Sequence, residues 1–528
     1  MKKSIFFLTI LFFSIAVYSQ VNQEWVARYD GPGSNYDEAN AVAVDQSGNV
    51  FITGQSEQSL LNFDCATIKY NSYGGEEWVQ RFNGSENQTD IGKSIAVVGS
   101  GDVYVLAQSH VNFVTFKYTN LLGNELWKKI LNNCNGAATL VLDSQTNIYV
   151  TGAGDNNASN NNDYTTIKYN ILGTEQWIAQ YSGPDSLDDG ASDITVDNYG
   201  NVYVTGIIGG YISSDYATAK YNHLGVVQWS QTYNGPADFD DGAIAIALDD
   251  SGNVYVTGSS EQSYGVRDYA TIKYNSTGVL RWVNRFNFVG DDVAKDIAVD
   301  GEGNVYVTGW SEGIGTSTDY ATIMYSSAGV QQWVARYNGP DSLGDGAYAL
   351  ALDASGNVYV TGGSTKDWYE DCVTVKYNPN GSEIWVQRYN GPGNQSDQGK
   401  AIAVDDAGNV YVTGGSYGDG TKTDYVTIKY SQPAGIEPIS KYIPTEYNLF
   451  QNYPNPFNPA TTIEFSIPKS EFISLKVYDI LGEEVATVVA DRLSAGNHKY
   501  TWDTTGLAGG IYFYRLESGS FTEVRYQL

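Results

Sequence analysis

Short runs of alternating apolar and polar residues recur along most of the chain. The clearest copy consists of Ala243–Asp249, Gly252–Gly258, Asp268–Tyr274 and Arg281–Phe286, here called the first to fourth segments. Each run is rich in β-branched and aromatic residues and is bounded by Gly, Asn, Asp or Ser, which is typical of β-strands joined by tight turns. The pattern therefore predicts four strands in each copy.

This unit returns eight times. A tryptophan in the fourth segment marks each return, at Trp25, Trp78, Trp127, Trp177, Trp229, Trp282, Trp333 and Trp385. Successive markers are 49 to 53 residues apart, and four strands per period of that length is typical of a β-propeller blade. We expect the tryptophans to pack where neighbouring blades splay apart, and the small residues of the first segments to line the crowded centre.

The fourth segments are out of phase with the others. The first of them, residues 24–29, precedes every first segment, and the last third segment, residues 424–430, has no tryptophan segment after it. The N-terminal strand is therefore expected to complete the last blade and to remove an exposed sheet edge. The predicted fold is all-β, an eight-bladed β-propeller over residues 20–430 that is closed by the N-terminal strand.

Loop lengths separate two faces of this propeller. The turn between the first and second segments has a constant length and reads Asp249-Asp-Ser-Gly-Asn253 in the copy above. We interpret it as hairpin chemistry and not as a calcium loop, because the alternating ligands and the final bidentate Glu of an EF-hand are missing. The loops from second to third segment, and from the fourth segment to the next copy, vary in length. The face that they build, here called the variable-loop face, is where we expect function.

Carboxylates recur at two positions on the variable-loop face. One set precedes the first segments: Asp37, Asp90, Asp189, Asp241, Asp292, Asp345 and Asp397, with Asn135 in the third copy. The other set opens third segments: Asp64, Asp163, Asp215, Asp268, Asp319, Asp371 and Asp424. Either these carboxylates accept backbone N–H bonds from loops, or they form a ring that holds cations such as Ca²⁺ or a polyhydroxylated ligand. On the second reading the first set supplies the metal ligands, and its like charges crowd one mouth of the central channel.

Composition narrows the possible partners. The net charge is −30, from 60 acidic and 30 basic residues, which argues against nucleic acid or an anionic membrane as partner. The cysteines Cys65, Cys134 and Cys372 are expected to be free, mostly buried thiols, and the three histidines, His110, His223 and His498, show no metal-binding spacing. We expect no cofactor apart from the Ca²⁺ considered above.

No catalytic constellation stands out in the sequence. It shows no Gly-x-Ser-x-Gly elbow, no phosphate loop and no metal-binding histidine pair. The favoured function is a non-catalytic binding or interaction module, with a glycan or protein ligand on the variable-loop face, and a monomer is expected. Two alternatives stay open: a carbohydrate-active enzyme with its site in the irregular second and third copies, and a structural or adhesive surface component.

Both ends of the chain differ from the repeats. Residues 1–19 have the charged start, Lys2 and Lys3, and the short apolar run, Ile5 to Val17, of a secretory signal peptide. The mature protein is therefore expected to be exported and to have no transmembrane segment. Residues 431–446 contain three prolines and are expected to be a linker. Residues 447–528 are expected to form about seven short strands, as in a small Ig-like β-sandwich.

Two resemblances support this organisation. The repeated Val-Asp-x-x-Gly-Asn-Val-Tyr-Val-Thr-Gly core over residues 24–430 resembles SBBP propeller repeats and, more loosely, NHL repeats. The C-terminal part resembles the type A sorting domain of the type IX (Por) secretion system. The matching residues are Tyr453-Pro454-Asn455-Pro456-Phe457-Asn458-Pro459, Leu475–Gly482, Ala495–His498 and Gly510–Arg515. This second resemblance implies a protein of a Bacteroidetes-type bacterium, with the type IX machinery as partner and the outer-membrane surface or the medium as destination.

Overall fold

The computed structural model describes residues 21–59, 62–84, 88–99, 101–155, 161–184, 187–209, 213–431, 437–438, 444, 446–455, 460–469, 471–482, 484–493, 496–503, 510–518 and 521–527. The predicted signal peptide lies outside these residues. Within them the regular structure is all β, and none forms a helix long and apolar enough to cross a membrane. The chain divides into two compact units, one of residues 23–431 and the other containing residues 432–528.

The repeats form strands close to the predicted segments. The first strands are β2 (Asp37–Val44), β6 (Asp90–Val97), β10 (Gly136–Leu142), β14 (Gly190–Val196), β18 (Asp241–Leu248), β22 (Asp292–Val299), β26 (Asp345–Leu352) and β30 (Asp397–Val404). The second strands are β3 (Val50–Ser59), β7 (Val103–Ser109), β11 (Ile148–Gly154), β15 (Val202–Ile208), β19 (Val254–Ser263), β23 (Val305–Glu312), β27 (Val358–Lys366) and β31 (Val410–Tyr417). The third strands are β4 (Asn62–Tyr70), β8 (Asn112–Tyr118), β12 (Asp163–Tyr169), β16 (Asp215–Tyr221), β20 (Val266–Tyr274), β24 (Thr318–Tyr325), β28 (Tyr369–Tyr377) and β32 (Thr423–Ser431). The fourth strands are β5 (Glu76–Phe82), β9 (Glu125–Asn132), β13 (Glu175–Tyr181), β17 (Val227–Tyr233), β21 (Leu280–Phe286), β25 (Gln331–Tyr337), β29 (Glu383–Tyr389) and β1 (Asn22–Tyr29).

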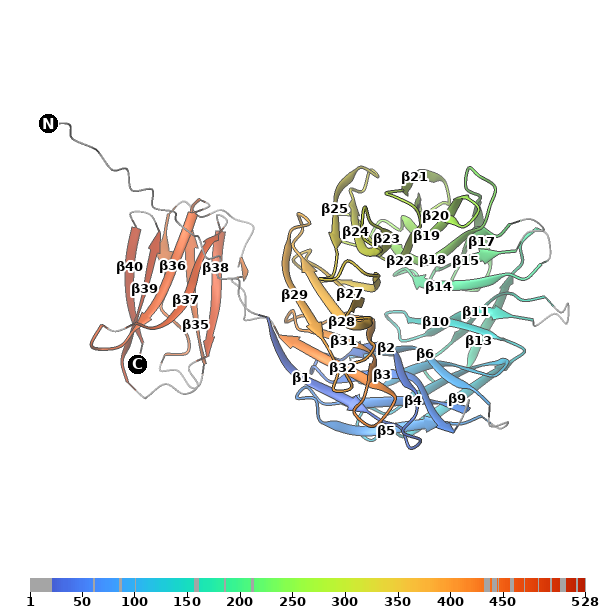
Figure 1. Cartoon of the computed structure of the whole chain (residues 1–528), viewed down its shortest axis with the longest axis horizontal. Helices are drawn as coiled ribbons and strands as arrows, with labels where there is room; N and C mark the ends of the chain where they lie inside the picture. The colour runs from blue at the N-terminus through green and yellow to red at the C-terminus, as the bar shows by residue number, and fades with distance from the viewer. Residues whose placement is uncertain are drawn as a thin grey trace. The chain divides into compact units, whose positions relative to one another are not determined.

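These strands form eight four-stranded antiparallel sheets, numbered here from sheet 1 (β2 to β5) to sheet 8. Sheet 8 has the order β1-β32-β31-β30, so the N-terminal strand pairs with the last third strand, as the sequence predicts. Each first strand contacts the first strand of the next sheet, and β30 contacts β2, which closes the ring seen in Figure 1.

The hydrophobic core lies between consecutive sheets. At the closing junction Tyr411 and Tyr425 of sheet 8 pack with Val50 and Ile52 of sheet 1. All four side chains are fully buried, because the second and third strands are covered on both faces. Sheets that pack face to face in this way bury their apolar faces against their neighbours, and that burial drives the assembly of the ring.

Each junction is fastened at its outer edge by a tryptophan. Trp25 of β1 lies 6.3 Å from the Tyr70 ring and 6.4 Å from the Tyr411 ring, and its Nε1 donates to the Ser72 carbonyl at 3.1 Å. Gly74 has a φ of 82°, and a Cβ there would come within 2.7 Å of the indole. The turn therefore requires glycine for two reasons: its backbone has a positive φ, and the indole that covers it leaves no room for a Cβ. The predicted packing role of the tryptophans is confirmed.

The C-terminal unit contains two four-stranded sheets in the described residues. One has the order β33 (Glu437–Pro438), β38 (Gly496–Asp503), β35 (Ala460–Ile467), β34 (Asn448–Leu449), and the other β37 (Glu484–Leu493), β36 (Glu471–Tyr478), β39 (Tyr512–Ser518), β40 (Phe521–Gln527). Ile463 and Phe465 of the first sheet share one buried cluster with Leu475 and Tyr514 of the second. β33 lies within the stretch expected as linker, where it pairs with β38.

Candidate functional site

The first set of carboxylates lies at the start of the first strands, where every member is buried to 2% exposure or less. One oxygen accepts a backbone N–H from the preceding loop, as from Gly31 to Asp37 at 2.8 Å and from Gly391 to Asp397 at 2.7 Å. The same bond joins Gly84 to Asp90, Gly183 to Asp189, Gly235 to Asp241, Phe288 to Asp292 and Gly339 to Asp345. These residues therefore hold the loops, the first of the two roles that the sequence left open.

Their placement differs from a ring of charges at an open channel mouth. The carboxylates are buried between sheets, and Asn135, which takes their place in the third copy, is exposed. Burial raises the pKa of Asp345, hydrogen bonds from Gly339 and Ser364 lower it, and the neighbouring Asp319 raises it. The nearest like charge thus comes from the third strand of the preceding sheet.

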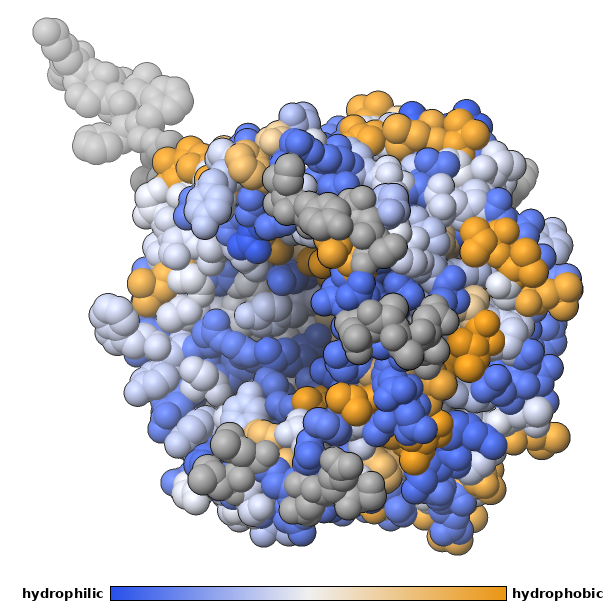
Figure 2. Space-filling view, turned by 90° about the vertical axis from the view of Figure 1, so that its right-hand side faces the viewer, coloured by the Kyte–Doolittle hydropathy of each residue, from blue (hydrophilic) through white to orange (hydrophobic). Residues whose placement is uncertain are grey.

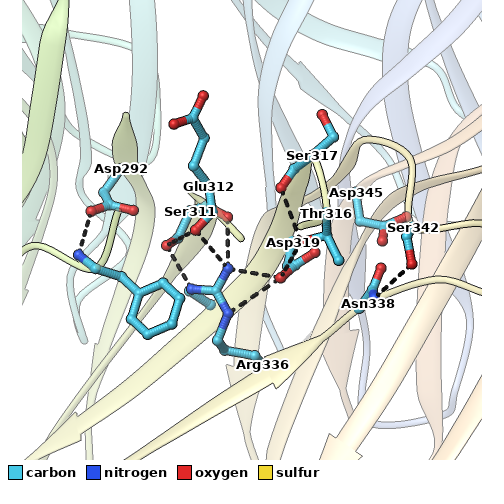
Figure 3. Close-up of polar contacts among 12 residues, drawn as sticks. Asp292, Ser311, Glu312, Thr316, Ser317, Asp319, Arg336, Asn338, Ser342 and Asp345 are labelled. Atoms are coloured by element: carbon cyan, nitrogen blue, oxygen red, sulfur yellow. Dashed lines mark hydrogen bonds and ion pairs between the residues drawn. The ribbon is translucent and has the colours of Figure 1, made fainter. Parts of the chain in front are cut away.

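Arginines of the fourth strands organise the same region (Figure 3). Arg336 donates to Ser311 Oγ at 2.6 Å and to the Ser311 carbonyl at 2.9 Å, and it forms an ion pair with Asp319 at 2.8 Å. Its guanidinium also lies over the Phe288 ring, 4.4 Å from the centroid. Arg336 therefore connects the ends of β23, β24 and β25 through five hydrogen bonds and one aromatic contact.

The same arginine, serine and aspartate meet in four other sheets. These sets are Arg28, Ser416 and Asp424; Arg81, Ser56 and Asp64; Arg285, Ser260 and Asp268; and Arg388, Ser364 and Asp371. Sequence reasoning named the aspartates but missed the arginines and serines. The available signal was their joint occurrence: Gly154 with Gln180, and Ile208 with Thr232, replace serine and arginine together.

Sheets 2 to 4 therefore form a contiguous sector without this network. In sheet 2 the serine remains as Ser109, but Asn112 and Ile130 stand for the aspartate and the arginine. The rest of the ring keeps the network, so the variable-loop face differs between two sectors. An uninterrupted symmetric ring, as a uniform repeat would give, is absent from the described residues of this face.

Three carboxylates meet where sheet 8 joins sheet 1. Asp30, Asp37 and Asp424 each place one carboxylate oxygen within 4.8 Å of the others. Sequence reasoning named Asp37 as a metal candidate. It assigned no role to Asp30 and did not predict that Asp424 lies close to Asp37. These oxygens form the candidate cation site of the protein.

Two further aspartates bridge alternate junctions near the centre. Asp193 of β14 accepts the N–H of Ile246 in β18 at 2.9 Å, and Asp296 of β22 accepts that of Leu350 in β26 at 2.8 Å. Burial raises the pKa of Asp193 to about 7 and that of Asp296 to about 6, against the lowering effect of these backbone bonds. Both side chains therefore titrate near neutral pH.

The remaining candidates behave as turn and core residues. Asp249 accepts N–H bonds from Ser251 and Asn253 at 2.9 Å each and the Tyr255 hydroxyl at 2.9 Å, which confirms the hairpin interpretation of the Asp-x-x-Gly-Asn turns. The three cysteines are free and buried, as expected. Burial raises the pKa of the Cys65 thiol to about 12, so this thiol is unreactive at neutral pH.

Part of the predicted sorting motif is visible in the C-terminal unit. Tyr453 is 80% exposed, and its backbone N–H donates to the Thr462 carbonyl at 2.9 Å. The Pro454 carbonyl accepts the Thr461 hydroxyl at 2.9 Å. Pro456, Phe457, Asn458 and Pro459 lie outside the described residues.

Comparisons with known proteins agree with both units. The model of the secretion system C-terminal sorting domain matches residues 451–526, and the model of the SBBP β-propeller repeat matches residues 24–60, 176–211, 281–315 and 384–420. No curated protein matches the sequence.

Solved structures similar to this chain have low sequence identity to it. The chain is similar to the Dos1 propeller, with a TM-score of 0.53 and 11% identity over 77% of this chain and 95% of that one. It is also similar to the polysaccharide lyase Uly1, with a TM-score of 0.43 and 10% identity over 78% of this chain and 99% of that one. At such identities the first likeness shows a propeller fold alone, and the second carries no argument about activity.

Proposed function

We propose that this chain, which carries SBBP β-propeller repeats and a type IX secretion sorting domain, is a non-catalytic binding module that presents its variable-loop face to a glycan or protein ligand. The sorting domain indicates secretion or display at the cell surface. We infer that the eight sheets are the blades of one propeller closed by β1, and that the C-terminal unit is an Ig-like sandwich recognised by the secretion machinery.

One exposed tryptophan on the variable-loop face carries the proposal. Trp368 is 85% exposed and occupies, with Asp367, the two-residue turn between β27 and β28. Both residues have positive φ, 51° for Asp367 and 75° for Trp368. A bulky residue in this region costs about 1–2 kcal/mol, which glycine would not incur.

Packing does not offset the backbone strain at Trp368, because its indole faces solvent. The turn is nevertheless held in place, because Asp341 Oδ2 accepts the Asp367 N–H at 2.9 Å. An exposed indole on an anchored turn offers a flat apolar surface for a sugar ring or an apolar side chain of a partner. Local strain without a structural gain is typical of a functional position.

The two preceding sheets, 5 and 6, also carry exposed apolar residues at the tips of the equivalent turns. Tyr264, in the turn between β19 and β20, is 91% exposed, and Ile314, between β23 and β24, is 77% exposed. On the side of the molecule displayed in Figure 2, apolar residues form separate small groups among hydrophilic ones. A binding mode based on single aromatic contacts at loop tips fits such a surface better than a broad apolar interface does.

Replacing Trp368 by glycine separates binding from stability. The Trp368→Gly protein should lose at least about tenfold in affinity for its ligand on glycan and protein arrays. It should also melt at the same or a higher temperature, because glycine relieves the backbone strain. The matched control is Tyr199→Ser in the tight turn between β14 and β15, an equally exposed aromatic residue on the opposite face, which should leave binding unchanged.

Two results would contradict the proposal. Undiminished binding by the Trp368→Gly protein would remove the indole from the site. Release of product from an arrayed glycan would favour the alternative of a carbohydrate-active enzyme.

A further inference from the structure

The junction at which the ring closes differs from the other junctions by a third carboxylate. Asp37 opens β2, Asp424 lies in β32, and Asp30 follows β1 directly. Asp37 and Asp424 are 0% and 4% exposed, whereas Asp30 is open to solvent. The three carboxylates approach within 4.8 Å of one another, so their like charges repel strongly unless a cation offsets them.

One of the two buried carboxylates, Asp424, has an oxygen with no donor. Asp37 Oδ2 accepts the Gly31 N–H at 2.8 Å, and Asp424 Oδ2 accepts from Arg28 at 2.8 Å and from the Thr421 hydroxyl at 3.0 Å. The Ser56 hydroxyl is a hydrogen-bond partner of Asp37, whereas Oδ1 of Asp424 is buried and has no hydrogen-bond partner within the described part of the chain. A buried carboxylate oxygen left without a partner is costly, and a metal ion is one of the few groups that can satisfy it while also neutralising its neighbours.

Asp30 is a carboxylate at a position where another junction has an amide hydrogen-bond donor. The position five residues after the tryptophan of the fourth strand holds Asn83, Asn132, Ser182, Asn234, Asn287, Asn338 and Asn390 in the other copies. Asn287 Nδ2 donates to Asp268 Oδ1 at 3.0 Å, and Asp268 is the counterpart of Asp424. At the closing junction this amide donor is exchanged for a carboxylate, which accepts only.

The neighbouring cations leave a double negative charge. Arg28 pairs with Asp424, and Arg81, which also lies close to Asp37, gives its donors to Tyr29, Ser56 and Asp64. Three carboxylates against the single guanidinium of Arg28 match a divalent ion. An all-oxygen donor set selects hard cations, and the variable coordination of Ca²⁺ suits ligands from three separate segments better than the strict octahedron of Mg²⁺.

We propose that Asp30, Asp37 and Asp424 bind one Ca²⁺ ion that joins the N-terminal strand, β2 and β32 at the closure of the ring. This inference does not depend on the ligand of the variable-loop face. The ion would act as a structural clamp between residues that lie far apart in sequence.

The test uses the full exported protein after treatment with EDTA and dialysis. Isothermal titration with CaCl₂ should show one saturable site per chain. The melting temperature should rise by about 2–6 °C between EDTA and about 1 mM Ca²⁺, since a ligand of the folded state stabilises by mass action. A parallel titration with MgCl₂ should give a clearly smaller rise.

The decisive variant is Asp30→Asn, which installs the residue that six other copies carry. It should fold, lose the saturable heat and the Ca²⁺-dependent rise, and melt in EDTA no lower than the natural protein. Asp30→Ser, as at Ser182, gives a second route to the same test. Asp250→Asn, an exposed carboxylate in a tight turn on the opposite face, should keep the full Ca²⁺ response.

Three outcomes would overturn the proposal. The first is a natural protein with no saturable binding and an unchanged melting temperature in millimolar Ca²⁺. The second is an Asp30→Asn protein that responds to Ca²⁺ as the natural one does. An equal response to Mg²⁺ would overturn the choice of Ca²⁺.

Discussion

At the scale of single residues, aspartates differ in the pKa of their carboxyl groups because their hydrogen-bond donors differ. Burial raises the pKa of Asp193 to about 7. Burial acts in the same direction on Asp249, but hydrogen bonds from Asn253, Tyr255 and Ser251 outweigh it and hold the pKa of that carboxyl below its usual value. The two side chains therefore couple folding to pH with opposite signs.

Substituting these two aspartates should show that contrast. A raised carboxyl pKa stabilises the fold below the unfolded value near 4, and this contribution is lost as pH rises through about 7. Asp193→Asn should therefore raise stability at pH 8 by about 1–2 kcal/mol relative to its effect at pH 5. Asp249→Asn should lower stability at both values. Thermal melts across pH check this, and an Asp193→Asn protein with the pH profile of the natural one would contradict it.

The residue scale is also where sequence reasoning reached least far. The turn role of Asp249 and the burial of Cys65 could be predicted, because each depends on a local pattern or on residue type. The meeting of Asp30 with Asp424 could not, since the two are neighbours only after the ring has closed. The pairing of Arg336 with Asp319 was likewise hidden in separate strands, and the joint loss of arginine and serine in sheets 3 and 4 indicated only the contact of arginine with serine.

At the scale of elements, alternation and turn chemistry located the strands well. All eight second strands start at equivalent positions of the repeat, from Val50 to Val410, because the preceding tight turn fixes where pairing begins. Strand ends were less predictable: β19 runs to Ser263, past the expected Gly258. Backbone pairing continues there into polar residues, and these show no alternation of apolar and polar positions from which the end of the strand could be predicted.

The strand most open to test is β1. A chain that starts at Ala39 loses Trp25, the ion pair of Arg28 with Asp424, and one strand of sheet 8, so it should unfold at a temperature lower by about 10 °C or more. Differential scanning calorimetry against a chain that starts at Val21 measures this. If the two chains melt together, closure by β1 does not stabilise the ring.

At the scale of the whole molecule, the sorting domain and the propeller repeats lie in separate compact units. The C-terminal unit has its own buried cluster, formed by residues such as Phe465 and Tyr514. Its seven expected strands are present, while β33 was missed because two residues carry no periodicity. The two-sheet organisation was predictable from strand spacing; its role in export rested on motifs such as Tyr453 to Pro459.

Truncation separates these two roles. A chain that ends at Ser431 should fold and melt as the propeller does in the full protein, because its core is complete. It should accumulate in the periplasm, as cell fractionation would reveal, since it has lost the sorting domain. Residues 447–528 fused to a periplasmic reporter should carry that reporter outward. Normal extracellular amounts of the truncated chain would contradict the sorting role.

The pairing of β1 with β32 gives the ring a seam. Sheets 1 to 7 are each made from one continuous stretch, but sheet 8 needs residues 22–29 to find residues 423–431. A molecule opened at this seam displays a loose strand at one end and a vacant strand position at the other. These two surfaces are complementary between molecules as well as within one. Reciprocal exchange would give swapped dimers, and unreciprocated exchange would give open-ended chains. A clamp at Asp30, Asp37 and Asp424 would act against both, which gives the ion a role in keeping the molecules separate.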